Sequence, residues 1–383
     1  MLTMIPVTLI VTVLKELVSL RYGVADFWAH AFLSTSLVGA ILFSPVAGLL
    51  IDRISRRGLL VSLALVGNGL CFFAMAMAPT FAVLMLARFI EGALHITALS
   101  AWLATAASQS PEGRSGRIMG AMGGMLMLGI TIGVPLGGII AKWDPNLVLW
   151  AAGWISLLGG LLALVFIRGR YHGREHISIA EFAGMVRNHP WLAIPYAYAF
   201  IDRLCIGVVV SSMGLYMSDV LGLSPAQRGM ELSYFLVVFA ALSYPAGRLS
   251  DRMGRAIPIA VGSILFGLVF MSYGYLSEAT LMLGMVASGV FSAIMFSPTL
   301  ALCKDLSGDT SHGTAFSGYN VAGSLGFVVG PLLGGSLFAW FQTSHSTLEA
   351  YRQTFFLTGS FEILIALITL PLLMKLKRQG RVR

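Results

Sequence analysis

Charged side chains are scarce in this sequence. Asp, Glu, Lys and Arg make up 11% of the residues, against about 25% in an average soluble protein, and hydrophobic residues make up 57%. Apolar runs of about 20 residues, the length that a helix needs to cross a bilayer, recur along almost the whole chain. The composition excludes an ordinary soluble protein and predicts an all-α integral membrane protein.

Cysteine is also rare, and familiar catalytic motifs are missing. Cys71, Cys205 and Cys303 each lie in a different apolar run, without CxxC spacing or a nearby His, so we interpret them as small buried hydrophobic residues. The sequence contains no HExxH, P-loop or GxSxG motif, and its loops are short. We therefore expect no metal, no cofactor and no enzymatic activity.

The apolar runs predict twelve transmembrane helices and their orientation. The expected spans are approximately 1–18, 29–51, 58–78, 81–107, 117–141, 147–167, 191–218, 228–250, 257–277, 279–303, 315–341 and 353–374. With a cytoplasmic N-terminus, 18 Arg and Lys residues fall on the cytoplasmic side and 5 on the other. This positive-inside distribution predicts that both termini are cytoplasmic in a cell inner membrane. It also accounts for the net charge of +8 without a nucleic-acid partner.

The sequence repeats itself at an interval of about half its length. "GLLIDRISR" (48–56) and "GRLSDRMGR" (247–255) share a skeleton at an offset of 199 residues. The stretches 115–138 and 312–335 also match, at an offset of 197, with five glycines in register. We therefore expect two parallel six-helix bundles. The expected domains are 1–167 and 191–383, joined by a cytoplasmic linker at 168–190 whose amphipathic part, 177–186, lies on the membrane surface.

Each repeat carries a row of glycines at four-residue spacing. The rows are Gly129, Gly133 and Gly137 in the fifth helix and Gly326, Gly330 and Gly334 in the eleventh, which also contain Pro135 and Pro331 respectively. Small residues at this spacing allow helices to approach closely in a membrane, where hydrophobicity does not drive them together. We expect both rows to be packing surfaces on which helices can also slide or rock.

The repeated charged turns resemble the signature loop of the major facilitator superfamily of secondary transporters. The matching residues are Gly48, Asp52, Arg53 and Arg56 in the first turn and Gly247, Asp251, Arg252 and Arg255 in the second. "LMLARFIEGALHI" resembles the superfamily's Arg-x-x-Gln-Gly signature, with Glu91 in the usual Gln place. "GITIGVPLGG" resembles the Gly-Pro motif of its drug antiporters, with Pro135 one residue late. The resemblance implies a twelve-helix transporter in which the turns latch the two halves in an outward-facing state.

Ionisable residues inside the predicted helices are the candidates for a transport site. Arg88, Glu91 and His95 share one face of the fourth helix, and Asp202 and Arg203 lie in the seventh. Glu91 and Asp202 each fall roughly ten residues into their helices, or about 15 Å, which is near mid-membrane. The resemblance implies that both helices line a central cavity. Isolated charges there are costly, so each needs a partner or a function.

A proton relay or substrate contact and a purely structural ion pair between Arg88 and Glu91 remain alternative interpretations of these residues. Because Arg88 lies one turn from Glu91, we expect Glu91 to stay ionised and, with His95, to tune the charge of the cavity. Asp202 is freer to exchange a coupling proton, with Arg203 orienting it or competing for it. Glu231 and Glu362 are weaker candidates, which we expect to form structural pairs or to lie near headgroups.

The favoured function is proton-coupled export of small amphipathic compounds by a monomer in the bilayer. Uptake of a small metabolite or anion, with Arg88 or Arg203 as the anion contact, and lipid transport are alternatives. A membrane-embedded enzyme or a transport-inactive sensor is disfavoured, because the sequence has no catalytic motif and no appended domain. In the alignment of the repeats, Asp202 falls opposite Thr3, so we expect either a start upstream of Met1 or an unusually short first helix.

Overall fold

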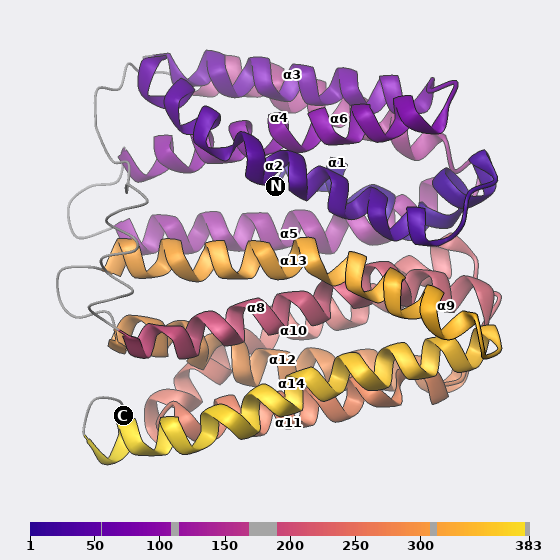
Figure 1. Cartoon of the computed structure of the whole chain (residues 1–383). Helices are drawn as coiled ribbons and strands as arrows, with labels where there is room; N and C mark the ends of the chain where they lie inside the picture. The colour runs from indigo at the N-terminus through magenta and orange to yellow at the C-terminus, as the bar shows by residue number, and fades with distance from the viewer. Residues whose placement is uncertain (55, 109–114, 168–189, 307–311, 380–383) are drawn as a thin grey trace. The chain divides into compact units, whose positions relative to one another are not determined.

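The computed structural model describes residues 1–54, 56–108, 115–167, 190–306 and 312–379, and within these ranges every regular element is a helix (Figure 1). Ten of the helical segments are long and apolar enough to cross a membrane, and a shorter apolar stretch, Leu128–Ile140, lies in an eleventh. The first segment is short and divided. The predictions of an all-α membrane protein and of twelve helical segments are confirmed.

The chain divides into two compact units. Unit 1 comprises Met1–His176 and Leu223–Met230, and unit 2 comprises Ile177–Gly222 and Glu231–Arg383. The predicted linker, 168–190, and its amphipathic part lie outside the described residues, apart from Pro190. Residues 223–230, which the sequence places in the second bundle, belong to unit 1 in the structure.

The helices of unit 1 follow the predicted spans closely. They are α1 (Ile5–Leu9), η1 (Ile10–Val13), η2 (Lys15–Leu20), α2 (Phe27–Arg53), α3 (Arg57–Ala76), α4 (Phe81–Ser108), α5 (Ser115–Ile140) and α6 (Leu147–Phe166). Helix α3 lies beside both α4 and α6, and α2 lies beside α4 (Figure 1). The first transmembrane segment is divided into an α-helical, a 3-10 and a π-helical part.

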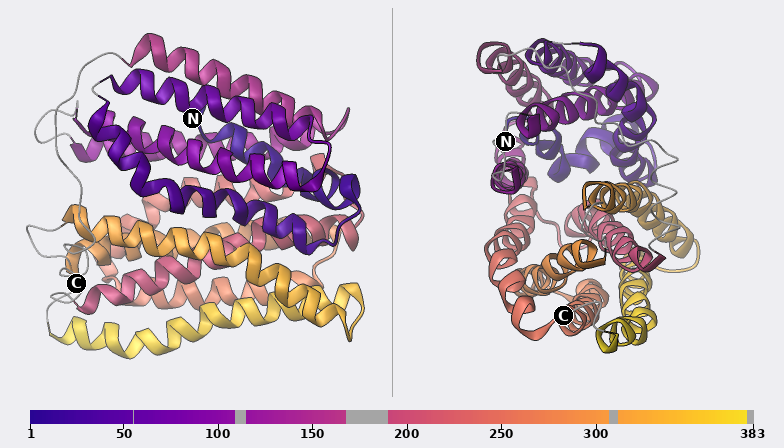
Figure 2. Two further views of the ribbon diagram at one scale, coloured as in Figure 1. Left: turned by 45° about the horizontal axis from the view of Figure 1, so that its top comes forward. Right: turned by 90° about the vertical axis from the view of Figure 1, so that its left-hand side faces the viewer.

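Unit 2 repeats this arrangement. Its helices are η3 (Pro190–Leu192), α8 (Ala193–Val208), η4 (Val209–Met213), α9 (Gly214–Asp219), α10 (Pro225–Met253), α11 (Ala256–Ser272), η5 (Tyr273–Tyr275), α12 (Glu278–Leu306), α13 (His312–Gln342) and α14 (Thr347–Arg378). The first residues of α10, up to Met230, belong to unit 1. Helix α11 packs against α12 and α14, as α3 packs against α4 and α6 in unit 1. Figure 2 shows these helices side by side and end-on.

The beginning of α10 is held in unit 1 by close packing and by charge. A Cβ atom at Gly138 would lie 2.3 Å from the backbone oxygen of Pro225, so only glycine allows α5 to approach this closely. Arg228 is 1% exposed and forms an ion pair with Glu16 of η2. These contacts explain why residues 223–230 group with unit 1.

The two glycine rows lie where the backbones of neighbouring helices come closest. In unit 1, a Cβ atom at Gly133 would lie 2.0 Å from Thr8 Oγ1, and one at Gly137 would lie 1.9 Å from the Leu9 backbone oxygen. Gly129 faces Met1 and Met4 in the same way. The row on α5 therefore packs against the first transmembrane segment.

Helix α13 packs on α8 in the same manner in unit 2. A Cβ atom at Gly326 would lie 2.1 Å from the Phe200 backbone oxygen, and one at Gly330 would lie 2.4 Å from that of Leu204. Gly334 faces Val208 and Ser212. Pro135 and Pro331 lie within α5 and α13. The matching glycine rows of α5 and α13 thus have the same packing role in the two repeats.

We expect the substitution Gly137→Ala to destabilise the protein, because the new methyl group would overlap the Leu9 carbonyl and force α1 and α5 apart. Overpacking of this kind costs about 1–3 kcal/mol. Thermal unfolding of the purified protein measures it. Gly159→Ala on α6 is the matched control, since its nearest neighbour would be at 3.5 Å, an ordinary contact. Equal melting temperatures for the two variants would contradict the packing role.

Candidate functional site

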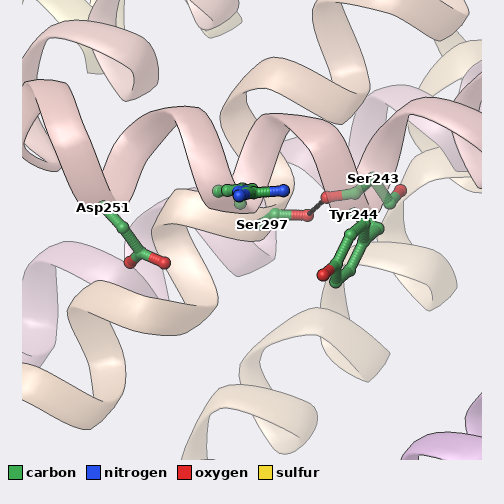
Figure 3. Close-up of a pocket in the computed structure, with 6 residues that line it drawn as sticks. Ser243, Tyr244, Asp251 and Ser297 are labelled. Carbon is green, nitrogen blue, oxygen red and sulfur yellow. Dashed lines mark hydrogen bonds between the residues drawn. The ribbon is translucent and has the colours of Figure 1, made fainter.

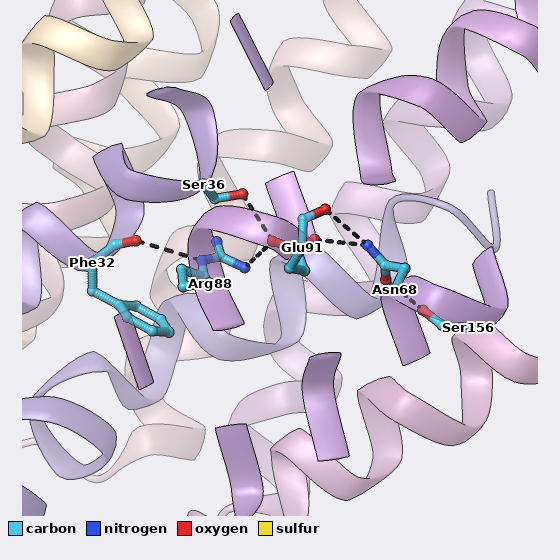
Figure 4. A network of polar contacts seen from close by, with 6 residues as sticks. All are labelled: Phe32, Ser36, Asn68, Arg88, Glu91 and Ser156. Carbon is cyan, nitrogen blue, oxygen red and sulfur yellow. Dashed lines mark hydrogen bonds and ion pairs between the residues drawn. The ribbon is translucent and has the colours of Figure 1, made fainter. Parts of the chain in front are cut away.

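Unit 1 contains a buried polar network centred on Glu91 (Figure 4). Arg88 and Glu91 lie one turn apart on α4, with Arg88 Nη1 2.8 Å from Glu91 Oε2. Ser36 Oγ of α2 donates to the same oxygen at 2.8 Å, and Asn68 Nδ2 of α3 donates to Glu91 Oε1 at 3.0 Å. Ser156 Oγ of α6 donates to Asn68 Oδ1 at 2.9 Å. The network joins four helices of the unit.

Both charged side chains of this network, Arg88 and Glu91, are buried. Arg88 is 2% exposed and Glu91 is 0% exposed. Arg88 Nε donates to the Phe32 backbone oxygen at 3.4 Å, and its guanidinium carbon lies 4.9 Å from the centre of the Phe32 ring. Pairing and hydrogen bonds of this quality offset the large cost of burying two charges. The observed geometry is that of the structural ion pair.

His95 shares the face of α4 but takes no part in these hydrogen bonds. Its Nδ1 is buried and has no hydrogen-bond partner in the described residues. The predicted trio therefore separates into an ion pair and an imidazole whose Nδ1 is not hydrogen-bonded in the described residues. Ser36, Asn68 and Ser156 were not predicted as site residues from the sequence, because single Ser and Asn residues are common in apolar runs. Asn68 could have been found, because a side-chain amide within the apolar run 58–78 needs a hydrogen-bond partner inside the membrane.

Asp202 has the opposite environment in unit 2. It lies on α8, is 5% exposed, and its Oδ1 has no hydrogen-bond partner in the described residues. Arg203 attracts it electrostatically but forms no ion pair with it. Instead, the Arg203 guanidinium carbon lies 5.6 Å and 5.8 Å from the ring centres of Tyr319 and Phe327 on α13. Consecutive helical residues point in different directions, which explains the separation.

Glu362 on α14 differs from its expectation. The sequence suggested a structural ion pair or a position near headgroups, yet Glu362 is 0% exposed and its Oε1 has no hydrogen-bond partner in the described part of the chain. Its Oε2 lies 3.7 Å from Cys205 Sγ of α8. The expectation was wrong because a linear sequence does not reveal which face of α14 meets α8.

The charged turn of unit 2 is organised around Arg255, which is 8% exposed. Its Nη1 lies 2.5 Å from Asp251 Oδ1 and 2.8 Å from Ser250 Oγ, while its Nε lies 3.1 Å from Asp305 Oδ2. Burial lowers the pKa of Arg255, but the two carboxylates outweigh it and raise the pKa above its usual value. A permanent cation therefore joins the ends of α10, α11 and α12.

The other charged residues of the two turns are more exposed to solvent than Arg255, where the structure describes them. Arg252 and Arg56 are exposed, and Gly254, with a φ of +86°, adopts a left-handed conformation that favours glycine. Gly48, Asp52 and Arg53 belong to the end of α2, but their packing lies outside what the structure describes. Their role as a latch stays a prediction.

We expect Asp52→Asn to shift the protein toward an inward-open state and to lower the maximal transport rate several-fold more than substrate affinity, because the latch would lose its anion. Transport assays and the labelling of cysteines introduced on the inner side of a cysteine-free background measure these effects. Asp144→Asn, an exposed substitution in the same unit, is the control. Labelling and transport that match this control would contradict the latch.

An open pocket of about 630 Å³ lies between α10 and α12 in unit 2 (Figure 3). Its lining consists of Ser243, Tyr244, Gly247, Arg248, Asp251 and Ser297. Ser297 Oγ donates to the Ser243 backbone oxygen at 2.7 Å, and the Tyr244 side chain is 79% exposed. The lining thus combines an exposed aromatic ring with Arg248 and with Asp251, the carboxylate that is paired with Arg255.

Comparisons with known proteins assign the family. The sequence pattern of the Major Facilitator Superfamily matches residues 1–202 and again 196–382. The chain is 27% identical over 291 residues to the class G tetracycline resistance protein of Vibrio anguillarum, covering 73% of each protein. It is 22% identical over 367 residues to the multi-drug resistance efflux pump PmrA of Streptococcus pneumoniae, covering 92% of this chain and 88% of the pump.

A solved structure agrees with this assignment. The bacterial homolog of the human lysosomal transporter Spinster, in an inward-facing and unoccupied conformation, superposes with a TM-score of 0.82 at 14% identity, over 97% of this chain and 94% of that one. The chain therefore belongs to the major facilitator superfamily. It is a multi-pass membrane transporter of small molecules, and not an enzyme.

Proposed function

We propose that this transporter exports small amphipathic compounds in exchange for protons. The observation that carries the proposal is the environment of Asp202, a buried carboxyl group without a hydrogen bond to its Oδ1 or a paired cation. Such a group is well suited to bind and release a proton, because its neutral form costs far less to bury than its charged form. Glu91, by contrast, is held by Arg88, Ser36 and Asn68.

The direction and the substrate class rest on separate support. Relatives that align over most of the chain carry the names of a tetracycline resistance protein and a multi-drug efflux pump. The pocket of unit 2, with Tyr244 beside Arg248 and Asp251, offers contacts to both an apolar ring and a charged group. The relatives are the feature that favours amphipathic drugs over sugars.

We further propose that the protein works as a monomer with both termini in the cytoplasm of an inner membrane. The excess of Arg and Lys in alternate loops supports this orientation. A topology reporter fused after Arg383 tests it: we expect activity only in the cytoplasm. Activity only outside the cytoplasm would overturn the orientation.

Transport by the purified protein in liposomes tests the exchange. Ethidium and tetracycline serve as probes, with xylose as a neutral control. An exchanger accumulates a probe when the liposome interior is acidic, and a protonophore abolishes the accumulation. A proton symporter accumulates it when the interior is alkaline. Accumulation of a probe with an alkaline interior, or of xylose alone, would contradict proton-coupled export.

A further inference from the structure

A second carboxyl group accompanies Asp202 in the interior of unit 2. Cys205 lies one turn after Asp202 on α8, and its Sγ is 3.7 Å from Glu362 Oε2 and 3.8 Å from the Thr358 backbone oxygen, one turn before Glu362 on α14. The thiol thereby joins the two helices at the level of the carboxyl groups. Glu362 therefore lies beside the same stretch of α8 that carries Asp202, one helical turn from it.

Neither carboxyl group is held in an ion pair in the described part of the chain. Asp202 Oδ1 and Glu362 Oε1 are both buried and without a hydrogen-bond partner among the described residues. The guanidinium of Arg203, the residue next to Asp202 in the sequence, lies over the rings of Tyr319 and Phe327 on α13. One unpaired carboxylate is costly to bury, and two neighbouring ones also repel each other.

The other titratable groups that face the two carboxyls carry no positive charge. They are Tyr198 and Cys205 of α8 and Tyr319 of α13, with Tyr273 of η5 next to Cys205. The Tyr198 hydroxyl is 2.6 Å from Thr369 Oγ1, and the Tyr273 hydroxyl is 2.6 Å from Ser288 Oγ. The hydroxyls of Tyr198 and Tyr273 therefore already have partners. The Cys205 thiol provides a neutral contact to Glu362.

We propose that Asp202 and Glu362 form one proton-binding site, which always retains at least one proton. When Asp202 releases a proton, its negative charge makes Glu362 hold its own more firmly, so the pair exchanges one proton and never carries two negative charges. Glu362 is therefore the partner that allows Asp202 to ionise reversibly inside unit 2. This inference rests on the proposed proton exchange and assigns that function to a pair instead of one residue.

Infrared difference spectroscopy of the purified full-length protein in lipid nanodiscs tests the pair without any substrate. Protonated carboxyl groups have a C=O stretching band that shifts in D2O. Titration between roughly pH 5 and pH 9 separates buried groups from exposed carboxyls, which remain ionised over most of this range. We expect a wild-type band that changes with pH and a second band that persists to the alkaline end.

Substitution of either member should alter the other. Glu362→Gln and Asp202→Asn should each remove one band and shift the pH at which the remaining band changes by about one unit or more. Cys205→Ser provides a milder variant, because a hydroxyl is a stronger donor than a thiol. It should shift the frequency of the Glu362 band and leave the number of bands unchanged.

Glu349→Gln is the matched control, an identical substitution at the partly exposed beginning of α14. Two bands that respond to substitution independently of each other, or no buried protonated band in the wild type, would overturn the pair. A response to Na⁺ at constant pH without a response to protons would also overturn it. If the pair behaves as expected but no probe is transported, the proposed export fails and the proton site stands.

Discussion

Asp202→Asn is expected to abolish accumulation driven by a pH gradient while binding of a transported probe changes by less than about tenfold, which corresponds to about 1.4 kcal/mol. Asn has nearly the shape of the protonated Asp, so the interior of unit 2 should accept it. It has no proton to exchange within the working pH range, so uphill transport should fall to the level of protein-free liposomes. Downhill exchange of the probe should persist.

Asp219→Asn provides the matched control in the same transmembrane segment. Asp219 lies at the end of α9, where its Oδ2 accepts a hydrogen bond from the Tyr351 hydroxyl at 2.7 Å. We expect this variant to retain its response to a pH gradient. If Asp202→Asn retains that response as well, Asp202 has a structural role and the coupling assignment is wrong.

Arg88→Met is expected to destabilise unit 1 strongly, by about 3–5 kcal/mol, because it leaves the Glu91 carboxylate buried without a cation. Glu91→Gln should cost less, since Gln can keep hydrogen bonds with Ser36 and Asn68. The double substitution Arg88→Met and Glu91→Leu should recover much of the loss, because an apolar pair leaves no charge to compensate. Thermal unfolding of the purified protein, followed by Trp fluorescence, measures all three variants.

Lys142→Met is the control for the loss of a positive charge, because Lys142 is exposed just after α5. It should leave the stability unchanged to within about 0.5 kcal/mol. An Arg88→Met protein as stable as this control would show that the network contributes nothing to unit 1. A stable Arg88→Met protein that no longer binds a probe would instead assign Arg88 to the substrate.

The sequence determined the architecture because membrane insertion imposes local rules. Hydrocarbon thickness sets the length of each apolar run, and every backbone group must be satisfied within its own helix. The twelve segments could therefore be predicted from hydropathy alone. The two matching turns, at Gly48 and Gly247, indicated the repeat because the same local structure was needed twice.

The partners of the buried charges could be predicted only where they were local. Arg88 and Glu91 are three residues apart, so helical geometry alone brings them together. Asp202 and Arg203 are adjacent, yet the same geometry turns them toward different neighbours. Spacing within one helix thus predicted the Arg88–Glu91 ion pair and indicated that Asp202 and Arg203 do not pair.

Only the tertiary structure decided which helices supply the remaining contacts. Ser36, Asn68 and Ser156 come from three different helices, and Glu362 is 160 residues beyond Asp202 in the sequence. The rotation of each helix about its axis is set by close backbone approaches, such as that of Gly326 to Phe200, and not by its own hydropathy. Because α14 is apolar on most of its surface, nothing in its sequence reveals that Glu362 faces α8; the packing of unit 2 decides it.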